Sequence, residues 1–424
     1  MHELKTNAAY RTLLAAAAID GIGNSLYNIV FIIYAATMPF KALAVSLASM
    51  AGLLPALFAI LTGYWADQTR SKSRGLVRAY LLQTGLFLVL AGLIGQRGNL
   101  FLFCILLLIN IVSDICGGYA NGLNLPILKA TVPVSELNSA LSLNTASATT
   151  IQLVFGAVGA SLIVLLQHNY GLFGLLNAAS FALAAVLVFT MRRHLQVADK
   201  PTAATSERPA AKGESFFKSA AQTLKYLRHN HFIIAVMSVA IFINILGTSV
   251  DGLMSVSLLS MHQLWFGDYG YTVAIMNALF GIGMVTGALF ANDGLQKVPV
   301  LALSVGIAVS MGVLGLAFIY YGQSRLLIAA AILLSTYLTA KVNPRISAVL
   351  MSGIDSDHLA QAQGVLGLVA LIAAPLGQAI FLTLINAFGA PLAWTTFAVS
   401  GFILVLAVWF LARRVHEPQL VDEK

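Results

Sequence analysis

Charged residues are scarce in this chain of 424 residues, where Asp, Glu, Lys and Arg together make up 9%. A soluble domain carries roughly a quarter, and a disordered chain combines high net charge with low hydrophobicity, so both classes are excluded. Cysteine is also scarce, since the chain has only 2, whereas small secreted disulfide scaffolds need many more. Cys104 and Cys116 lie in one apolar stretch, where a helix holds them roughly 18 Å apart, beyond the reach of a disulfide.

Hydrophobic residues, in contrast, make up 59% of the sequence. A helix needs about 20 mostly apolar residues to cross the hydrocarbon core of a bilayer, and twelve such runs are present. The predicted spans are 11–37, 43–66, 76–95, 100–124, 138–166, 172–190, 231–259, 271–291, 299–321, 325–350, 359–386 and 391–412. The first run is longer than a signal-peptide core and has no small-residue cleavage site, so we interpret it as a retained helix. The sequence therefore predicts an all-α polytopic membrane protein.

The net charge of +8 suggests nucleic acid as a partner, but the positions of the charges argue against it. With both termini in the cytoplasm, the exterior loops hold only Lys41, Arg97 and Arg325, while nineteen Lys and Arg residues are cytoplasmic. Lys341 and Arg345 lie inside the tenth span. This asymmetry predicts a multi-pass protein of the cell (inner or plasma) membrane with both termini cytoplasmic, surrounded by membrane lipid and without nucleic acid.

One long polar segment divides the spans into six and six, and it predicts three parts. These are an N-terminal six-helix bundle over 1–198, a cytoplasmic linker over 199–230 and a C-terminal six-helix bundle over 231–424. Within the linker, Phe216, Phe217 and Leu224 recur near helical spacing beside Lys218 and Lys225. This pattern is typical of a helix lying on the membrane surface, and an extension of the seventh span is the alternative.

The two halves contain an internal repeat. Gly63 to Asp67 closes the second span, and Gly287 to Asp293 closes the eighth, 224 residues further on from glycine to glycine. The fifth and eleventh spans begin with similar segments at an offset of 222 residues. A common offset indicates two related six-helix units, an arrangement found in many transporters.

Twelve spans, the central linker and a Gly-x-x-x-Asp turn followed by basic residues together resemble the major facilitator superfamily. The resemblance covers nearly the whole chain and implies a fold of two six-helix halves that rock about a midplane site. In that family the turn is a conformational latch, which here implies Gly63, Asp67, Arg70 and Arg74, although Gln68 replaces the usual first basic residue. Gly287 and Asp293 belong to the degraded second copy.

Two residues give this latch a physical basis. Gly63 lets two helix backbones approach closely, and Asp67 accepts hydrogen bonds from helix amides or pairs with Arg70 or Arg74. A tight turn carrying cytoplasmic positive charge is the alternative, and it needs no latch.

Within the superfamily, the segments around Pro55, Pro126 and Glu136 are loosely similar to the enterobactin-exporter and macrolide-efflux group. Two features of many proton antiporters are missing. The fourth span lacks an arginine, and Gly156 and Gly159 in the fifth span lack the usual Gly-Pro pair. Both departures favour an importer over a proton-driven exporter.

Ionisable groups in hydrocarbon are functional candidates, because each costs several kcal/mol unless it is paired or hydrated. Asp20, Asp114 and Asp251 lie in the first, fourth and seventh spans, and we predict that they carry protons. The polar side chains around them fall on shared helical stripes, and the offset of 224 relates the first stripe to the seventh. The predicted cavity residues are Asn24, Tyr27, Asn28, Phe31, Asn110, Asn121, Asn244, Thr248, Ser255 and Lys341. The alternative is that these groups only fasten the bundle through hydrogen bonds of about 1 kcal/mol or less.

Lys341 and Arg345 stand one turn apart in the tenth span. Either side chain can pair with a carboxylate across the cavity or extend to the cytoplasmic headgroups. The second arrangement is favoured for Arg345, while both remain open for Lys341.

These observations predict a secondary transporter that works by alternating access and exports a small amphipathic organic molecule, drug-like or siderophore-like, in exchange for protons. A proton-coupled importer or facilitator of a polar nutrient is the alternative, and a non-transporting membrane sensor or scaffold is a third possibility. An enzyme is not expected, because no loop holds a zinc, nucleophile–base or phosphate-binding motif. The predicted partners are a small-molecule substrate, protons and lipid, with no metal or cofactor, and the predicted state is a monomer.

Overall fold

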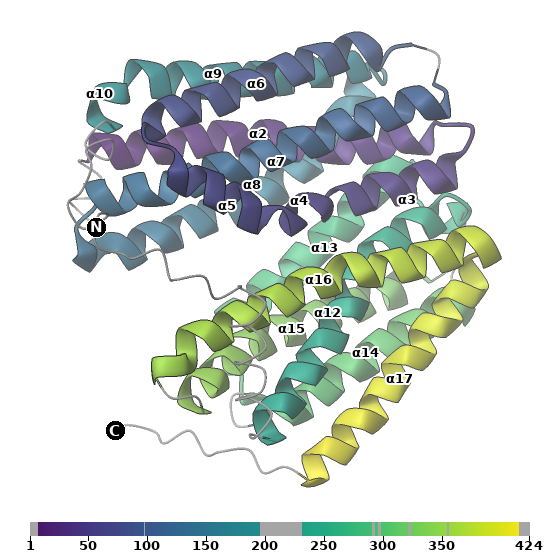
Figure 1. The fold of residues 1–424 in the computed structure, drawn as a ribbon. Coiled ribbons are helices and arrows are strands. Elements are labelled where there is room, and N and C mark those ends of the chain that lie inside the picture. The colour runs from purple at the N-terminus through teal and green to yellow at the C-terminus, as the bar shows by residue number, and fades with distance from the viewer. Residues whose placement is uncertain are drawn as a thin grey trace. The chain divides into compact units, whose positions relative to one another are not determined.

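A computed structural model of the chain describes residues 7–96, 98–195, 231–290, 293–295, 298–320, 324–353 and 356–414, and every structural statement concerns these. The predicted linker and its surface helix lie outside them. The chain divides into two compact units (Figure 1). The first comprises Met1–Arg208 and Gly267–Ala274, and the second comprises Pro209–Phe266 and Ile275–Lys424.

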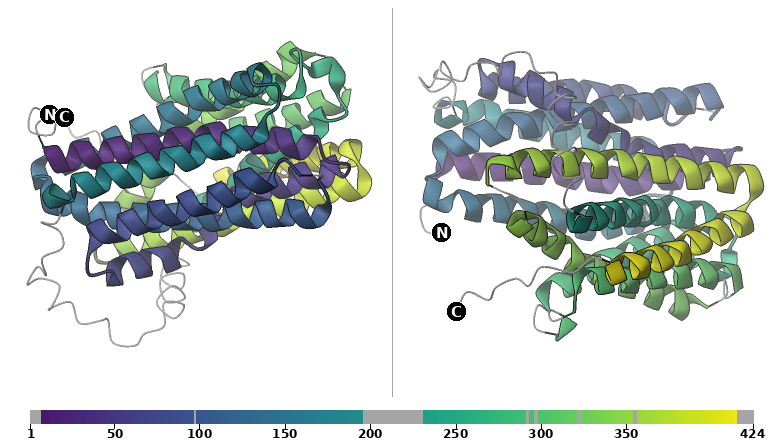
Figure 2. Two further views of the ribbon diagram at one scale, coloured as in Figure 1. Left: turned by 90° about the horizontal axis from the view of Figure 1, so that it is seen from above. Right: turned by 60° about the horizontal axis from the view of Figure 1, so that its bottom comes forward.

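The first unit is a bundle of long helices that run side by side (Figures 1 and 2). Its helices are α2 (Ala8–Ala36), α3 (Lys41–Ala51), α4 (Leu54–Leu57), α5 (Ala59–Gln68), α6 (Lys72–Leu93), α7 (Leu100–Thr131), α8 (Val134–Leu165), α9 (Tyr170–Thr190) and α10 (Arg192–Leu195). Three of them begin at an asparagine cap, where the side chains of Asn7, Asn99 and Asn169 accept hydrogen bonds from amides three residues ahead. Such caps satisfy amides that the first turn of a helix leaves unpaired.

The second predicted span is broken into α3, α4 and α5. Its two ends, Lys41–Leu57 and Leu61–Gln68, are bent by 46°. Pro55 lies in the first turn of α4, directly after α3 ends at Gly52. The 46° bend lies between Leu57 and Leu61, after α4, and Pro55 is tolerated where it stands because the first turn of a helix leaves its amides unpaired.

The second unit repeats the helix packing of the first. Its elements are α12 (His231–Leu258), η3 (His262–Leu264), α13 (Tyr269–Leu289), α14 (Val300–Tyr320), α15 (Arg325–Gly353), α16 (Ser356–Phe388) and α17 (Ala390–Arg414). In the first unit α2 packs on α8 and α9, and α6 packs on α7 and α9. In the second unit α12 packs on α16 and α17, and α14 packs on α15 and α17. The repeat seen in the sequence is therefore also a repeat of packing.

The helices have the length and composition of membrane spans. Among the described residues, eleven are long and apolar enough to cross a bilayer, and the bent pair makes a twelfth if it is counted as one span. On α6, Leu81, Leu82 and Val89 are each more than half exposed, as expected for side chains that face lipid. The prediction of an all-α multi-pass membrane protein is confirmed.

Candidate functional site

A chain of hydrogen bonds leads from α9 to Asp20 on α2. The Ser180 hydroxyl donates to Asn177 Oδ1 at 3.2 Å, and Asn177 Nδ2 donates to Asn24 Oδ1 at 3.5 Å. Asn24 Nδ2 in turn donates to Asp20 Oδ1 at 3.3 Å. Every donor points toward the carboxylate, and aligned hydrogen bonds of this kind polarise one another. Gly23 permits the arrangement, because a Cβ at this position would lie 2.8 Å from Ser180 Cβ and would push α2 away from α9.

The carboxylates of Asp20 and Asp114 belong to the same polar neighbourhood of the first unit. Asp114 on α7 lies within electrostatic range of Asp20, and so does Tyr80 on α6. Nearby, the buried Gln83 of α6 donates to the carbonyl oxygen of Ser113 at 3.1 Å. Two of the three predicted proton-carrying residues are thus brought together by helices that are far apart in the sequence.

Asp251 occupies a polar layer of the second unit, on α12. Its Oδ1 is buried and accepts no hydrogen bond from the described residues. Close by in sequence, Thr248 Oγ1 donates to the carbonyl oxygens of Asn244 at 2.7 Å and of Ala374 at 3.3 Å. Gln378 of α16 donates through Nε2 to the Thr248 carbonyl oxygen at 2.9 Å. The predicted stripe on α12 therefore makes hydrogen bonds with α16. The Oδ1 atom of Asp251 can still accept a hydrogen bond.

Two aromatic residues predicted for the cavity lie inside the first unit instead. Tyr27 is 1% exposed and Phe31 is 2% exposed. Their rings stack at 5.6 Å between centroids, Tyr27 meets Phe87 edge-on at 4.7 Å, and Phe31 stacks on Phe103 at 5.7 Å. Helical spacing placed them on the polar stripe, but the apolar faces of α6 and α7 surround them. This expectation is therefore corrected, and we interpret both rings as core packing.

The remaining cavity candidates differ in exposure. Asn110 is 5% exposed and Ser255 is buried, whereas Asn28 and Asn121 are exposed, and Asn244 is half-buried. Asn244 Nδ2 donates to the Ala240 carbonyl oxygen of its own helix at 2.8 Å. The structure therefore places Asn110 and Ser255 in the interior and leaves Asn28 and Asn121 accessible.

Sequence reasoning missed several members of these polar layers, chiefly Gln83, Asn177 and Gln378. Each is an amide within an apolar span, and each is at most 3% exposed. Because a buried amide needs hydrogen-bond partners, isolated amides in apolar spans were an available signal. Only the three-dimensional structure shows that Asn177 extends the stripe of Asp20.

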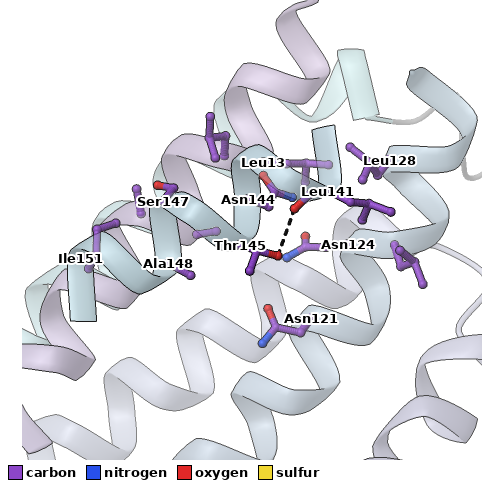
Figure 3. A pocket seen from close by; sticks show the side chains of 14 residues that line it. Leu13, Asn121, Asn124, Leu128, Leu141, Asn144, Thr145, Ser147, Ala148 and Ile151 are labelled. Atoms are coloured by element: carbon purple, nitrogen blue, oxygen red, sulfur yellow. Dashed lines mark hydrogen bonds between the residues drawn. The ribbon is translucent and has the colours of Figure 1, made fainter. Parts of the chain in front are cut away.

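A cavity of about 410 Å³ opens within the first unit between α2, α7 and α8 (Figure 3). One wall is polar, with Asn121 and Asn124 from α7 and Asn144, Thr145 and Ser147 from α8. The rest of the lining is apolar and comes from all three helices, and α2 contributes only apolar side chains to it. The full lining is Leu13, Leu14, Ala17, Ala18, Asn121, Asn124, Leu125, Leu128, Leu141, Asn144, Thr145, Ser147, Ala148 and Ile151. Of the predicted cavity residues, Asn121 lines this space.

Metal ligands do not gather anywhere in the described ranges, where no three His, Cys, Asp or Glu side chains lie close enough to hold an ion. The polar neighbourhoods of both units therefore consist of amides, hydroxyls and carboxylates, which suit hydrogen bonding and proton exchange.

The loop between α5 and α6 is fastened by Lys72, whose contacts the sequence did not predict. Lys72 is 9% exposed, and its Nζ donates to the carbonyl oxygens of Ala66 at 2.5 Å and Asp67 at 3.0 Å. The exposed Asp67 makes no ion pair with Arg70 or Arg74, which are exposed as well. The predicted pairing is therefore absent from this described segment, and the lysine closes the turn through backbone oxygens.

The predicted role of Gly63 in close helix packing also differs from what the structure shows. A Cβ at Gly63 would meet nothing within 4 Å, so Gly63 is not required for close packing. The requirement lies on the facing helix, where a Cβ at Gly122 of α7 would approach Ala66 Cβ to 2.8 Å. In the second unit the glycine itself is required for close packing, because a Cβ at Gly287 would lie 2.9 Å from Ala340 Cβ and would collide with the Tyr337 carbonyl oxygen.

The equivalent loop of the second unit is fastened by an ion pair. Lys341 Nζ lies 2.9 Å from Asp293 Oδ2 and also donates to the Phe290 carbonyl oxygen. The Tyr337 hydroxyl donates to the same Asp293 oxygen. Lys341 was predicted for the cavity, but in the structure its ammonium binds the loop after α13. Arg345, one turn further on, donates to the carbonyl oxygens of Leu295 and Val298 at 2.9 and 3.0 Å, so α15 holds this loop at two levels.

Replacing Asp293 by Asn should lower the midpoint temperature of thermal unfolding, because it leaves the Lys341 ammonium, which is 7% exposed, without its counterion. Hydrogen bonds from Tyr337 and Lys341 lower the pKa of Asp293 from 3.8 to about 2. Because the pKa of Asp293 is lower in the folded than in the unfolded protein, its carboxylate stabilises the fold at pH values above the unfolded pKa. This contribution is lost as the pH falls toward 2. The difference between the wild-type protein and the variant should therefore stay constant from pH 5 to 8.

Asp67→Asn is the matched control, since Asp67 holds the corresponding place in the first unit and makes no ion pair among the described residues. Its midpoint should stay close to that of the wild-type protein. Equal midpoints for Asp293→Asn and the wild-type protein would show that the ion pair does not stabilise the fold.

Comparison with known proteins agrees with this architecture. No curated protein matches the chain in sequence. Among solved structures, a peptide transporter POT in complex with sulfate superposes with a TM-score of 0.70 at 12% identity, covering 96% of this chain and 94% of that chain. A POT family transporter in complex with 5-aminolevulinic acid gives 0.68 at 14% identity, with 96% of each chain covered. The nucleoside transporter NupG gives 0.65 at 14% identity, covering 95% of this chain and 98% of that chain.

At these identities the solved structures establish the fold alone. The family model described as Major Facilitator Superfamily matches residues 13–378, which include the broken second span, the two fastened loops and all three aspartates within the spans. A protein with this match is a membrane transporter and not an enzyme. The repeat of helix packing, the number of spans and the family match lead to one conclusion: this chain belongs to the Major Facilitator Superfamily.

Proposed function

We propose that the chain is a secondary active transporter that couples the movement of a small organic molecule to protons by alternating access. The observation that carries this proposal is Asp20, which lies in an apolar span at the end of the hydrogen-bond chain through Asn24 and Asn177. No Lys or Arg among the described residues pairs with it. A carboxylate without a cation is costly in hydrocarbon unless it is hydrated or protonated. Exchange of a proton at Asp20 can therefore be coupled to the conformational cycle.

Asp251 is the corresponding candidate in the second unit. Its buried Oδ1 accepts no hydrogen bond from the described residues, and no cation among them pairs with it. Asp114 adds a second carboxylate near Asp20.

The favoured direction is export of a small amphipathic molecule in exchange for protons. The walls of the cavity in the first unit, one amide-rich and one aliphatic, support an amphipathic substrate. Uptake of a polar nutrient is the second candidate. The similarity to a peptide transporter and a nucleoside transporter favours it, since such solutes carry several hydrogen-bonding groups.

We propose that the transporter lies in the cell membrane with both termini in the cytoplasm, on the distribution of Lys and Arg. The loops after α5 and α13 are proposed as its latch. Lys72 and the pair of Lys341 and Asp293 support this role, because breaking their contacts frees each loop from the helix that holds it.

The test is transport by the purified protein in liposomes with an imposed pH gradient, screened against antibiotics, siderophores, sugars, nucleosides and short peptides. An exporter accumulates its substrate against the proton flow, whereas a symporter accumulates it with the proton flow. If the accumulation of every substrate is the same with and without the pH gradient, proton coupling is contradicted. Binding without flux for every compound indicates a sensor or scaffold.

A further inference from the structure

The cavity of the first unit has no charged side chain in its lining (Figure 3). Its volume of about 410 Å³ falls within the range of small-molecule sites in proteins. All of its lining residues come from α2, α7 and α8, so the cavity is complete within one unit. The chemistry of its walls therefore limits what it can bind.

The polar wall has hydrogen-bonding capacity that the protein does not use. Asn121, Asn124 and Asn144 make no side-chain hydrogen bond with other described residues, and the buried Oδ1 of Asn144 lacks a partner. Figure 3 shows Asn124 pointing from α7 toward Thr145 on α8. The Thr145 hydroxyl donates to the Leu141 carbonyl oxygen at 3.1 Å, so toward the cavity it acts as an acceptor. Each carboxamide offers two donors and an acceptor, and this wall can satisfy both kinds of group on a ligand.

The wall of the cavity that α2 forms offers no polar side chain. It is formed by Leu13, Leu14, Ala17 and Ala18, which follow one face of α2. The two alanines leave room for a ligand, while the two leucines supply aliphatic surface. A ligand that fits both walls has a polar end and an apolar body.

A charged ligand fits this cavity poorly. Burial of an ion is unfavourable unless a counterion or several hydrogen bonds compensate for its lost hydration. Asp20 lies on α2 beyond Ala17 and Ala18 but is not part of the lining, so it gives no direct counterion there. Amides and hydroxyls compensate an uncharged polar group much more completely than an ion.

We infer that this cavity recognises an uncharged amphipathic solute whose polar end both donates and accepts hydrogen bonds, as a carboxamide does. The inference rests on the proposed transport function and narrows its substrate class. The carboxamides of α7 and α8 bind the polar end, and the apolar body lies against α2. A neutral substrate leaves Asp20 free to exchange protons, because the substrate needs no counterion.

Three probes that share the phenylalanine side chain test the charge selectivity. N-acetylphenylalaninamide is neutral, N-acetylphenylalanine is an anion and phenylalaninamide is a cation at pH 6. Equilibrium dialysis of each labelled probe against the full chain in lipid nanodiscs, without a pH gradient, measures binding directly. We expect the neutral probe to bind at least tenfold more tightly than either charged probe. Tighter binding of the cation, with loss of that preference in Asp20→Asn, would overturn the inference, and so would equal binding of all three probes or no detectable binding of the neutral probe.

Cavity variants test the place of binding. Asn144→Leu and Asn124→Leu should each weaken binding of the neutral probe at least tenfold, and Thr145→Val should weaken it several-fold. Thr84→Val is the matched control, because the Thr84 hydroxyl bonds the carbonyl oxygen four residues earlier, as Thr145 does, and lies outside the cavity. Elution volume and unfolding midpoint show whether each variant is folded. Unchanged binding in folded Asn144→Leu and Asn124→Leu would contradict the proposed location.

This experiment is separate from the test of proton coupling, because it uses no gradient. Selective binding of the neutral probe without gradient-driven flux supports the cavity and contradicts the proposed function. Gradient-driven flux of ionic substrates only, without binding of the neutral probe, supports the function and overturns the inference.

Discussion

Asp20→Asn is expected to abolish proton-driven accumulation of substrate in liposomes while the protein still exchanges substrate across the membrane without a gradient. Asparagine keeps the oxygen that accepts the hydrogen bond from Asn24 Nδ2, at 3.3 Å in the wild-type protein, so the local structure is preserved. It cannot carry a proton. One charge moved through 100 mV supplies about 2.3 kcal/mol, or roughly a 50-fold gradient, and this accumulation is what the variant should lose.

Asp268→Asn is the control for this experiment. Asp268 precedes α13, and its Oδ1 accepts a hydrogen bond from the Tyr271 amide at 2.9 Å, a role that asparagine fills equally well. Its accumulation should equal that of the wild-type protein. Asp251→Asn extends the test to the second unit. Proton-driven accumulation that persists in both Asp20→Asn and Asp251→Asn would exclude coupling through these residues.

Gly287→Ala should destabilise the protein by about 1–3 kcal/mol, the usual cost of an added methyl group in a well-packed interior. The new Cβ would lie 2.9 Å from Ala340 Cβ and 3.0 Å from Tyr337 Cα, where a backbone atom cannot move aside without shifting α15. Thermal unfolding in detergent measures the effect.

Gly63→Ala is the matched variant at the repeat-related position. Nothing lies within 4 Å of its added Cβ, and alanine is the better helix former by about 1 kcal/mol. Its unfolding midpoint should therefore equal or exceed that of the wild-type protein. A loss of stability as large as that of Gly287→Ala would show that close packing around Gly63 differs from the structure.

The two loops show why repeat-related positions need not have the same role. Both copies of the motif place a glycine near the end of a helix and an aspartate a few residues later, in the last turn of α5 for Asp67 and after α13 for Asp293. In the first unit a lysine binds backbone oxygens and the aspartate makes no ion pair among the described residues, whereas in the second Lys341 binds Asp293 directly. The lysine comes from the first turn of the next helix, α6, in one case and from α15 in the other, and a local motif contains no information about α15.

The sequence by itself determined the membrane class, the number of spans and the repeat, whereas the break in the second span appeared only in the structure. Each depends on patterns that can be seen along the chain, such as an apolar run or a common offset between the two halves. Tertiary structure alone decided the partners of the polar groups. It joined Asn24 to Asn177, 153 residues later, and it turned Lys341 toward Asp293. It also enclosed Tyr27 in aromatic packing and arranged amides of α7 and α8 opposite α2. Helical periodicity shows which residues share a face of one helix, but the side chain that a face meets depends on how separate helices pack.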